Sequence, residues 1–207
     1  MKKPALDRKE LSTGTLSHQS KIFGEQLLLA ATNLNDVKIV KLDLEQCVLE
    51  NPSFDQTKIE EGLFSDCIVE KGSFTGTVFF KSYFSRTHFV SSRFQGVSAP
   101  ECHMNDVLFQ SSKLNGSNFR FGKLKDIVFE NCEMVGCDFL NAELEKVVFK
   151  HCNLQGSQFL KSQLKGVTLT GSNIEDISID KQSIVKATVS TGQALYLSGV
   201  FGLTIED

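Results

Sequence analysis

Residues 107–169 read VLFQSSKLNGSNFRFGKLKDIVFENCEMVGCDFLNAELEKVVFKHCNLQGSQFLKSQLKGVTL. A large apolar residue returns at every fifth position of this stretch, beginning with Phe109, Leu114 and Phe119 and continuing without a slip to Leu169. A helix returns its apolar face about every 3.6 residues and a strand every second residue, so a period of five fits neither. The stretch therefore indicates a repeat architecture, in which one short structural unit recurs many times.

The five-residue register extends in both directions from this stretch. It begins at Leu29 and ends at Val189, every position on it is hydrophobic, and all but four of the 17 Phe residues lie on it. Two residues before each register position the side chain is usually small or compact, as at Ser112 and Ser117. We interpret the cysteines as small buried hydrophobic residues, because all of them occupy this compact slot. They are Cys47, Cys67, Cys102, Cys132, Cys137 and Cys152.

The pattern of a small residue, Asn or Asp, Leu or Phe and two variable residues resembles the pentapeptide-repeat family over about residues 27–191. The resemblance implies an all-β solenoid, a right-handed quadrilateral β-helix of about eight coils with four pentapeptides in each coil. Residues 20 apart would then stack at the ~4.8 Å spacing of neighbouring strands. We expect a tail or cap over residues 1–26, the β-helix over 27–191, and a short C-terminal α-helix followed by a short strand over 192–207.

The C-terminal segment carries helix signals of its own. Ser190 and Gln193 have the spacing of a capping box, Gly202 stops the helix, and residues 203–205 alternate like a strand. This ending is similar to that of the quinolone-resistance branch of the family, where the segment makes the dimer contact. The resemblance implies a homodimer joined end to end, with a monomeric cap as the alternative. The expected contact residues are Ala194, Leu197, Val200, Phe201 and Leu203.

Two further expectations concern the interior. Pro52 stands in a compact slot, where its missing N–H should cost a ladder hydrogen bond. Ala99 and Pro100 together predict a local bulge or a loosened corner near residues 98–103. Cys47 should stack on Cys67, and Cys132 on Cys152 in the same way. Parallel side chains keep such pairs at about the coil spacing, wider than a disulfide prefers, so we predict six free thiols.

Composition and the N-terminal sequence set broad limits on function. The net charge of −3 and the sequence pI of about 5.8 exclude a strongly basic surface for binding nucleic acid. Residues 1–10 start with lysines but have no apolar segment behind them, and no stretch approaches the length of a membrane span. We therefore expect a cytoplasmic protein that binds neither nucleic acid nor membrane directly.

No arrangement of residues predicts catalysis, a cofactor or a metal site. His18 falls in the expected tail, whereas His88, His103 and His151 fall on outward positions of different coils or faces. His151 adjoins Cys152, but neighbouring residues point outward and inward in turn and so cannot share a metal ion. The sequence also lacks a phosphate-binding loop and a nucleophile elbow. We expect a protein that is not an enzyme.

Outward positions predict three stripes along the rod. Glu50, Glu70 and Glu130 form a partial acidic ladder, interrupted by Val90 and Gln110, and an ordinary solvated face is its alternative. A second stripe suits any β surface and needs no partner. It contains Leu28, Val48, Ile68, His88, Leu108, Val128 and Val148. A third, apolar set predicts an interaction patch, because exposed apolar clusters usually mark contacts. It contains Phe80, Phe121, Leu140 and Leu160.

Two functions from different classes fit these features. The resemblance to the quinolone-resistance branch implies a non-enzymatic protein that mimics DNA and occupies the DNA-binding site of a type II topoisomerase, DNA gyrase. The modest charge favours the alternative, a rigid scaffold that binds an unknown protein through its apolar face. The two differ in salt dependence, because mimicry through carboxylates weakens steeply as salt rises and apolar docking does not.

Overall fold

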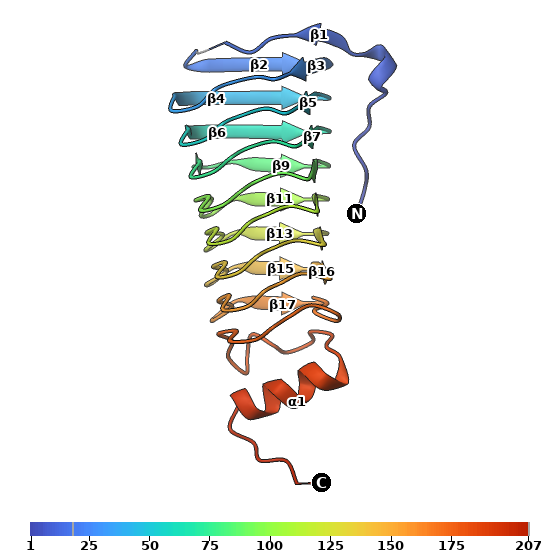
Figure 1. Cartoon of the computed structure of the whole chain (residues 1–207), viewed down its shortest axis with the longest axis vertical. Coiled ribbons are helices and arrows are strands. Elements are labelled where there is room, and N and C mark those ends of the chain that lie inside the picture. Colours follow the sequence, from blue (N-terminus) through green and yellow to red (C-terminus); the bar gives the residue numbers. More distant parts are fainter. Residues whose placement is uncertain (18, 207) are drawn as a thin grey trace.

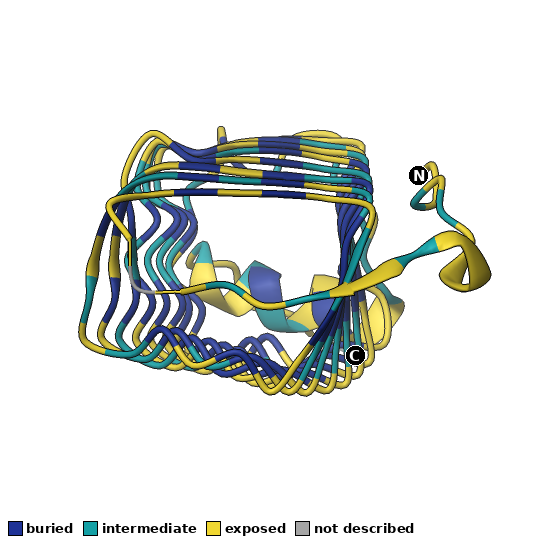
Figure 2. Ribbon diagram, turned by 90° about the horizontal axis from the view of Figure 1, so that it is seen from above, coloured by how far each residue is buried: buried dark blue, intermediate teal, exposed yellow. Residues whose placement is uncertain are grey.

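The computed structural model describes residues 1–17 and 19–206, and it confirms the predicted β-solenoid. The chain forms a four-sided parallel β-helix with its coils stacked along one axis and a helix across the C-terminal end (Figures 1 and 2). From β3 onward, paired strands lie 20 residues apart, as Phe109 and Phe129 do, which is the predicted register. Only β1 differs, because Ser12 pairs with Leu27, 15 residues later.

We name the four sides A to D in chain order. Face A is the sheet of β1 (Ser12–Gly14), β3 (Leu27–Ala30), β5 (Val48–Glu50), β7 (Ile68–Glu70), β10 (His88–Val90), β12 (Leu108–Gln110), β14 (Val128–Glu130) and β16 (Val148–Lys150). Face D is the sheet of β2 (Lys21–Glu25), β4 (Lys38–Glu45), β6 (Lys58–Ser65), β9 (Tyr83–Ser85), β11 (His103–Asn105), β13 (Lys123–Lys125), β15 (Glu143–Glu145) and β17 (Gln163–Lys165), with β8 (Val78–Phe79) also paired to β6.

Face B and the later coils of face C are held by single bridges rather than by regular strands. In the early coils the first residues of β4 and β6, together with β8, form regular strands on face C. Face B includes the bridges that link Asn33, Ser53 and Ser73, and face C includes those that link Asn118 and Asp138. A corner is named after the two faces that it joins, so residue 46 lies at corner DA and residue 121 at corner CD. Each coil thus passes in turn through faces A, B, C and D.

The register residues fill the interior as continuous stacks. Phe129 lies 5.1 Å from Phe149 between ring centroids with the rings 4° apart, and Phe109 stacks on Phe129 in the same way. These rings are almost completely buried. Offset stacking of aromatic rings adds to the free energy of burial itself, so each coil is stabilised mainly by the coils above and below it.

The corners depend on a left-handed backbone conformation. The residue two positions after a register residue has a positive φ at almost every corner, for example 53° at Asn131 and 57° at Asn141. Corner BC uses glycine at this position in five successive coils, where the absence of a Cβ removes the steric cost of that conformation. These residues are Gly76, Gly96, Gly116, Gly136 and Gly156.

Several compact slots also carry a hydrogen-bond donor. Ser117 donates its hydroxyl to the carbonyl of Phe94 at 2.6 Å, and Ser157 donates to the carbonyl of Met134 at 2.8 Å, each acceptor lying 23 residues earlier. The Cys137 thiol contacts the carbonyl of Leu114 in the same way at 3.1 Å. A short side chain with a donor therefore satisfies a buried carbonyl of the preceding coil.

All six cysteines are buried and free, as predicted. Burial raises the pKa of both Cys102 and Cys137 to about 12, so these thiols stay protonated at neutral pH.

The two predictions about prolines were wrong. At the corner that holds Pro52, the amides of Gly72 and Ser92 donate to serine hydroxyls of the next coil, so this position is not part of the backbone ladder. Residues 98–103 form no bulge, because Ser98 donates to Thr77 and Ala99 to Asn118 in the regular pattern. Proline is tolerated at position 52 because this position contributes no ladder donor. Next to Pro100, the amides of the corresponding residues Arg120 and Leu140 donate to the side chains of Asn118 and Asp138 rather than to the ladder.

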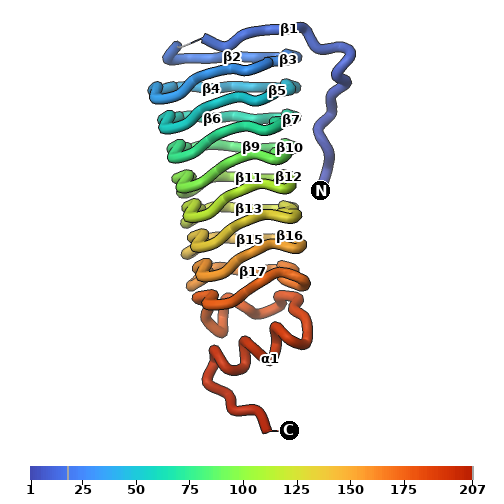
Figure 3. The backbone as a smooth tube through the Cα atoms, viewed as in Figure 1, coloured from blue at the N-terminus to red at the C-terminus, as the bar shows by residue number. Residues whose placement is uncertain are grey.

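Both ends differ in part from the predictions. Strands β1 and β2 precede residue 27, and residues 1–11, including the 3-10 turn η1 (Arg8–Glu10), lie along the side of the β-helix (Figure 3). At the other end, helix α1 (Thr191–Val200) has the predicted capping box between Ser190 and Gln193. Residues 203–205 form no strand, so that prediction was wrong. Among the described residues, no helix is long and apolar enough to cross a membrane.

The hydrogen bond from the compact slot can be tested by removing one hydroxyl. Ser117→Ala should lower the free energy of unfolding in urea by about 1 kcal/mol, because it deletes a buried hydrogen bond without adding volume. Ser98→Ala is the matched control, since Ser98 lies on an outward position of the preceding coil and should change stability by less than about 0.5 kcal/mol. Equal effects of the two substitutions would contradict the structural role of the buried hydroxyl.

Candidate protein-interaction surfaces

The histidines are dispersed, and no cluster resembles a metal site. Within residues 1–17 and 19–206, no group of three or more His, Cys, Asp or Glu side chains could hold a metal ion. His88 lies on face A, His103 on face D against the ring of Tyr83, and His151 at corner AB. His18 lies outside the described residues.

Two members of the predicted acidic ladder are paired with an arginine from the N-terminal segment. Glu50 and Glu70 are register partners on β5 and β7. The Arg8 guanidinium lies 3.4 Å from Glu50 Oε1 and forms a close ion pair with Glu70. A guanidinium placed between two carboxylates neutralises one of their two negative charges and so weakens the negative potential that they would present to a partner.

The third member of the ladder is also paired. Glu130 accepts a hydrogen bond from Lys150 at 2.6 Å and another from Gln110 at 3.0 Å. Lys150 and then Gln110 lower the pKa of Glu130, which keeps this carboxylate ionised and bound within the chain. The three glutamates therefore do not form a free row of negative charge.

The predicted apolar residues lie along one corner of the rod. The exposed fractions of Phe80 and Phe121 are 50% and 53%, whereas Leu140 and Leu160 are partly buried. Phe121 is at corner CD, and its amide donates to the carbonyl of Leu140. Arg120 lies on the same face and is bonded to Asp138 at 2.6 Å, so its charge is compensated beside the apolar residues.

Three more exposed residues flank the same corner, and sequence reasoning missed them. Phe23, Leu63 and Tyr83 point outward from face D next to corner CD, with 61%, 36% and 50% of their surface exposed. Within the described residues, every exposed Phe or Tyr side chain lies at or beside this corner. We call the combined set the CD edge. It consists of Phe23, Leu63, Phe80, Tyr83, Phe121, Leu140 and Leu160.

One signal in the sequence could have identified part of this edge. The Phe residues outside the five-residue register are Phe23, Phe80, Phe121 and Phe201, and the first three are all exposed here. An aromatic residue outside the register has no place in the core of such a coil. It must therefore lie on the surface or in an end structure.

The CD edge changes shape along the rod. Strands β4 and β6 run through the corner as continuous eight-residue strands, whereas the corner from Lys81 onward takes the left-handed turn. At the transition lies a hollow of about 310 Å³. Its lining residues are Lys41, Asp43, Glu61, Gly62, Leu63, Lys81 and Tyr83. The edge thus offers a concave, partly apolar site rather than a flat sheet.

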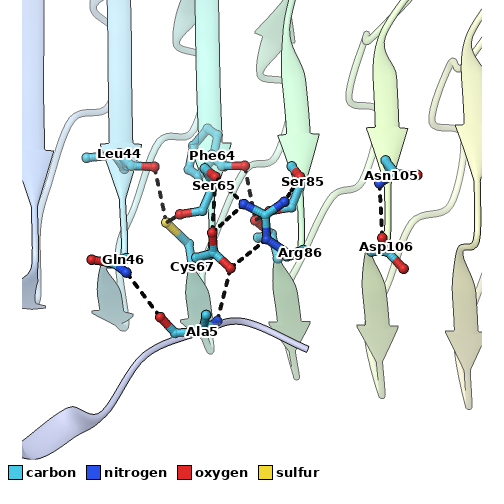
Figure 4. A network of polar contacts seen from close by, with 12 residues as sticks. Ala5, Leu44, Gln46, Phe64, Ser65, Cys67, Ser85, Arg86, Asn105 and Asp106 are labelled. Atoms are coloured by element: carbon cyan, nitrogen blue, oxygen red, sulfur yellow. Dashed lines mark hydrogen bonds and ion pairs between the residues drawn. The ribbon is translucent and has the colours of Figure 1, made fainter. Parts of the chain in front are cut away.

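Residues 1–11, which we call the strap, cover corner DA and part of face A. The amide of Lys2 donates to Asp106 Oδ1 at 2.5 Å, and the amide of Ala5 donates to Asp66 Oδ1 at 3.0 Å. The side chain of Gln46 donates to the carbonyl of Ala5 at 3.2 Å (Figure 4). The predicted N-terminal tail is therefore bound along the rod through its main chain.

Asp66 is the best-satisfied anchor of the strap. Its carboxylate is only 5% exposed and accepts hydrogen bonds from Arg86 at 2.8 and 2.5 Å as well as from Ala5. The Arg86 guanidinium lowers the pKa of Asp66, and the amide of Ala5 acts in the same direction against the effect of burial. The ionised form is thus stabilised by the folded, strap-bound state.

Helix α1 closes the C-terminal end, and only part of the predicted dimer contact is available. Leu197 is buried against the last coil, and Gln193 donates to the carbonyls of Leu169 and Ser172 at 2.7 and 2.8 Å. Leu197 therefore caps its own core and cannot reach a second chain. Phe201 is partly buried, and Ala194 is exposed. The exposed large apolar residues at this end are Val185, Leu195, Val200, Leu203 and Ile205.

The sequence matches the model of a protein family described as the pentapeptide repeat region, over residues 63–136 and 102–179. These matches span more than half of the chain. The chain belongs to the pentapeptide-repeat family. No curated protein matches it.

Several solved structures are similar to this pentapeptide-repeat protein at low sequence identity. HetL, a pentapeptide repeat protein involved in heterocyst differentiation regulation from the cyanobacterium Nostoc sp. strain PCC 7120, is 13% identical, with a TM-score of 0.35 over 83% of this chain and 89% of HetL. Full-length QnrB1, a plasmid-mediated fluoroquinolone resistance protein, is 15% identical, with a TM-score of 0.28 over 88% of this chain and all of QnrB1. The family assignment therefore rests on the sequence match.

The Asp66 anchor leads to a prediction about pH. Its folded pKa lies below the ordinary value of 3.8, so its stabilising effect is complete above that pH and is lost as pH falls through the lowered value. The NMR shift of the Ala5 amide proton should follow this titration, with a midpoint below 3.8, and Asp66→Asn should abolish the titration. A midpoint at or above 3.8 would show that Arg86 and Ala5 do not stabilise the carboxylate.

Proposed function

We propose that this pentapeptide-repeat protein is a rigid, non-enzymatic scaffold that binds a protein partner through the CD edge. The observation that carries the proposal is that every exposed Phe or Tyr side chain of the described residues lies at or beside one corner. Stacked coils fix the positions of these side chains, so binding a partner costs little ordering of the scaffold. Exposed apolar clusters rimmed by polar residues are typical of protein contacts.

Charged side chains around the CD edge favour specific binding of a partner, but they do not dominate this surface. Lys81 lies 5.5 Å from the centre of the Phe80 ring, and Lys41 lies 5.5 Å from that of Phe23. Glu61 and Asp43 line the same hollow. A mixed rim of this kind orients a partner and leaves most of the affinity to the apolar residues.

DNA mimicry and inhibition of DNA gyrase form a finer hypothesis that rests on the resemblance to the quinolone-resistance branch. Mimicry needs unpaired negative charge repeated along the rod. The pairing of Glu50 and Glu70 with Arg8, and of Glu130 with Lys150, disfavours it. We therefore propose apolar docking as the principal mode of interaction and treat gyrase as one partner to be tested.

Purified gyrase can be tested directly, together with partners captured from a lysate. Phe80→Ser with Phe121→Ser should weaken partner binding at least tenfold at both low and high salt, because two exposed apolar anchors are lost. Val135→Ser is the matched control, since Val135 is an exposed apolar residue on face B. Supercoiling by gyrase, titrated with this protein with and without a quinolone, tests that partner separately.

Opposite results would identify the other mode. If Glu50, Glu70 and Glu130 changed together to Gln abolish binding while the double Phe variant retains it, the acidic ladder is the interface and the CD-edge proposal is wrong. A gyrase activity that is unaffected up to micromolar concentrations of this protein would exclude gyrase as its target.

We also propose a two-fold dimer joined through the C-terminal end, where several apolar side chains are exposed. Leu195→Asp with Leu203→Asp should convert the dimer to a monomer in analytical ultracentrifugation. The midpoint of thermal unfolding of the monomer should stay unchanged. Leu197→Ala is the contrasting variant, because it should lower the midpoint by opening the cap. A wild-type chain that sediments as a monomer at high concentration would rule the dimer out.

A further inference from the structure

The first part of the strap is bound by main-chain hydrogen bonds, which do not depend on its sequence. Lys2 and Ala5 contribute main-chain amides, and Ala5 contributes its carbonyl. The two acceptors, Asp66 and Asp106, are 40 residues apart in the sequence and therefore two coils apart. Any segment with the same backbone path could make these hydrogen bonds.

The spacing of these contacts matches an extended chain. Two coils span about 9.6 Å, and three residues of extended backbone span about 10 Å. The amides of Lys2 and Ala5, three residues apart, therefore meet acceptors in every second coil. An extended peptide can follow the axis of the rod in this way without stretching or buckling.

One side chain of the strap adds a specific contact. Arg8 extends across face A and pairs with Glu50 and Glu70 on neighbouring strands. The planar guanidinium presents several donors in fixed directions, so it can bridge two carboxylates one coil apart, whereas an ammonium is a single point charge. Val48, an outward residue on the same strand as Glu50, is completely buried.

The strap is weakly held compared with the surface that it covers. Only Pro4, Leu6 and Leu11 of the strap are partly buried, and its other residues are exposed. By contrast, Asp66 and Asp106 are 5% and 6% exposed. An ion pair as exposed as those of Arg8 contributes little to stability. Segments with few buried apolar groups open at low free-energy cost.

His88 lies on the same stripe as Val48. Its Nε2 atom is buried and has no hydrogen-bond partner among the described residues. Burial and then Lys3 of the strap lower the pKa of His88. The surface therefore holds a polar atom that the strap leaves unsatisfied, and a different occupant with an acceptor or donor at this position would bind it better.

We propose that this surface is a docking surface for an extended, arginine-bearing segment of a partner protein, and that the strap is the occupant that such a segment displaces. We call it the DA surface. It consists of Gln46, Val48, Glu50, Asp66, Glu70, His88 and Asp106. The DA surface lies apart from the CD edge, so this proposal is independent of the proposed function.

The test uses the full chain with the strap released. The double variant Ala5→Pro with Arg8→Glu lacks the Ala5 N–H that donates to Asp66, and it lacks the positive charge between Glu50 and Glu70. Release is verified when the NMR amide shifts of residues 1–11 move to random-coil values while those of the coils stay unchanged. The probe is a fluorescent peptide with the sequence of residues 1–11.

The probe should bind the released chain at least tenfold more tightly than the wild-type chain, whose own strap competes at high effective concentration. Arg93→Glu is the matched control chain, since Arg93 is an exposed arginine on face B, and it should behave as wild type. Changing Arg8 to Lys in the peptide should weaken binding several-fold. A peptide of Ala and Ser that keeps only the arginine should still bind.

Three outcomes would overturn the proposal. The first is failure of the released chain to bind the probe, and the second is binding of the native strap sequence alone and not of the Ala and Ser peptide. The third is a wild-type dimer that the released chain loses in sedimentation, which would assign the DA surface to the strap of a second copy. The Phe80→Ser and Phe121→Ser changes, added to the released chain, should leave peptide binding intact, which separates this test from that of the CD edge.

Discussion

Every other feature of the molecule depends on the stacking of inward side chains between coils 20 residues apart. Phe rings such as Phe109, Phe129 and Phe149 form continuous columns. The compact slots beside them satisfy carbonyls of the preceding coil through hydroxyls and thiols. No coil could bury these groups alone, so the free energy of folding belongs to the interfaces between coils.

This interior leaves the outward positions free to differ. The outward side chains carry little of the packing, so charge and apolarity can vary from coil to coil without loss of the fold. At corner CD the variation gives a line of exposed aromatic residues with a hollow where the corner changes shape. At corner DA it gives the carboxylates that bind the strap. Function in such a protein is therefore carried by its corners and faces.

The strap also changes the electrostatic effect of the acidic residues on face A. Glu50 and Glu70 look like part of a repeating negative ladder when only the register is considered. In the folded chain Arg8 lies between them, and Lys150 pairs with Glu130 in the same sheet. The electrostatic potential of face A thus depends on contacts between distant segments. It cannot be obtained by counting the charges along one stripe.

The period of five, the compact slot of the cysteines and the capping box of α1 could be predicted from the sequence alone, because each follows from local spacing. The 20-residue register was implied by the resemblance to the pentapeptide-repeat family, because a period of five does not fix how many repeats close a coil. The sequence also identified Phe80 and Phe121 as outward residues. It missed the binding of residues 1–11, the burial of Leu197 and the tolerance for Pro52 and Pro100. It missed Phe23, Leu63 and Tyr83 as neighbours of the same corner. These were decided by tertiary structure, because they depend on which groups from distant coils meet, and a repeat gives the same local signal whether a surface is open or covered.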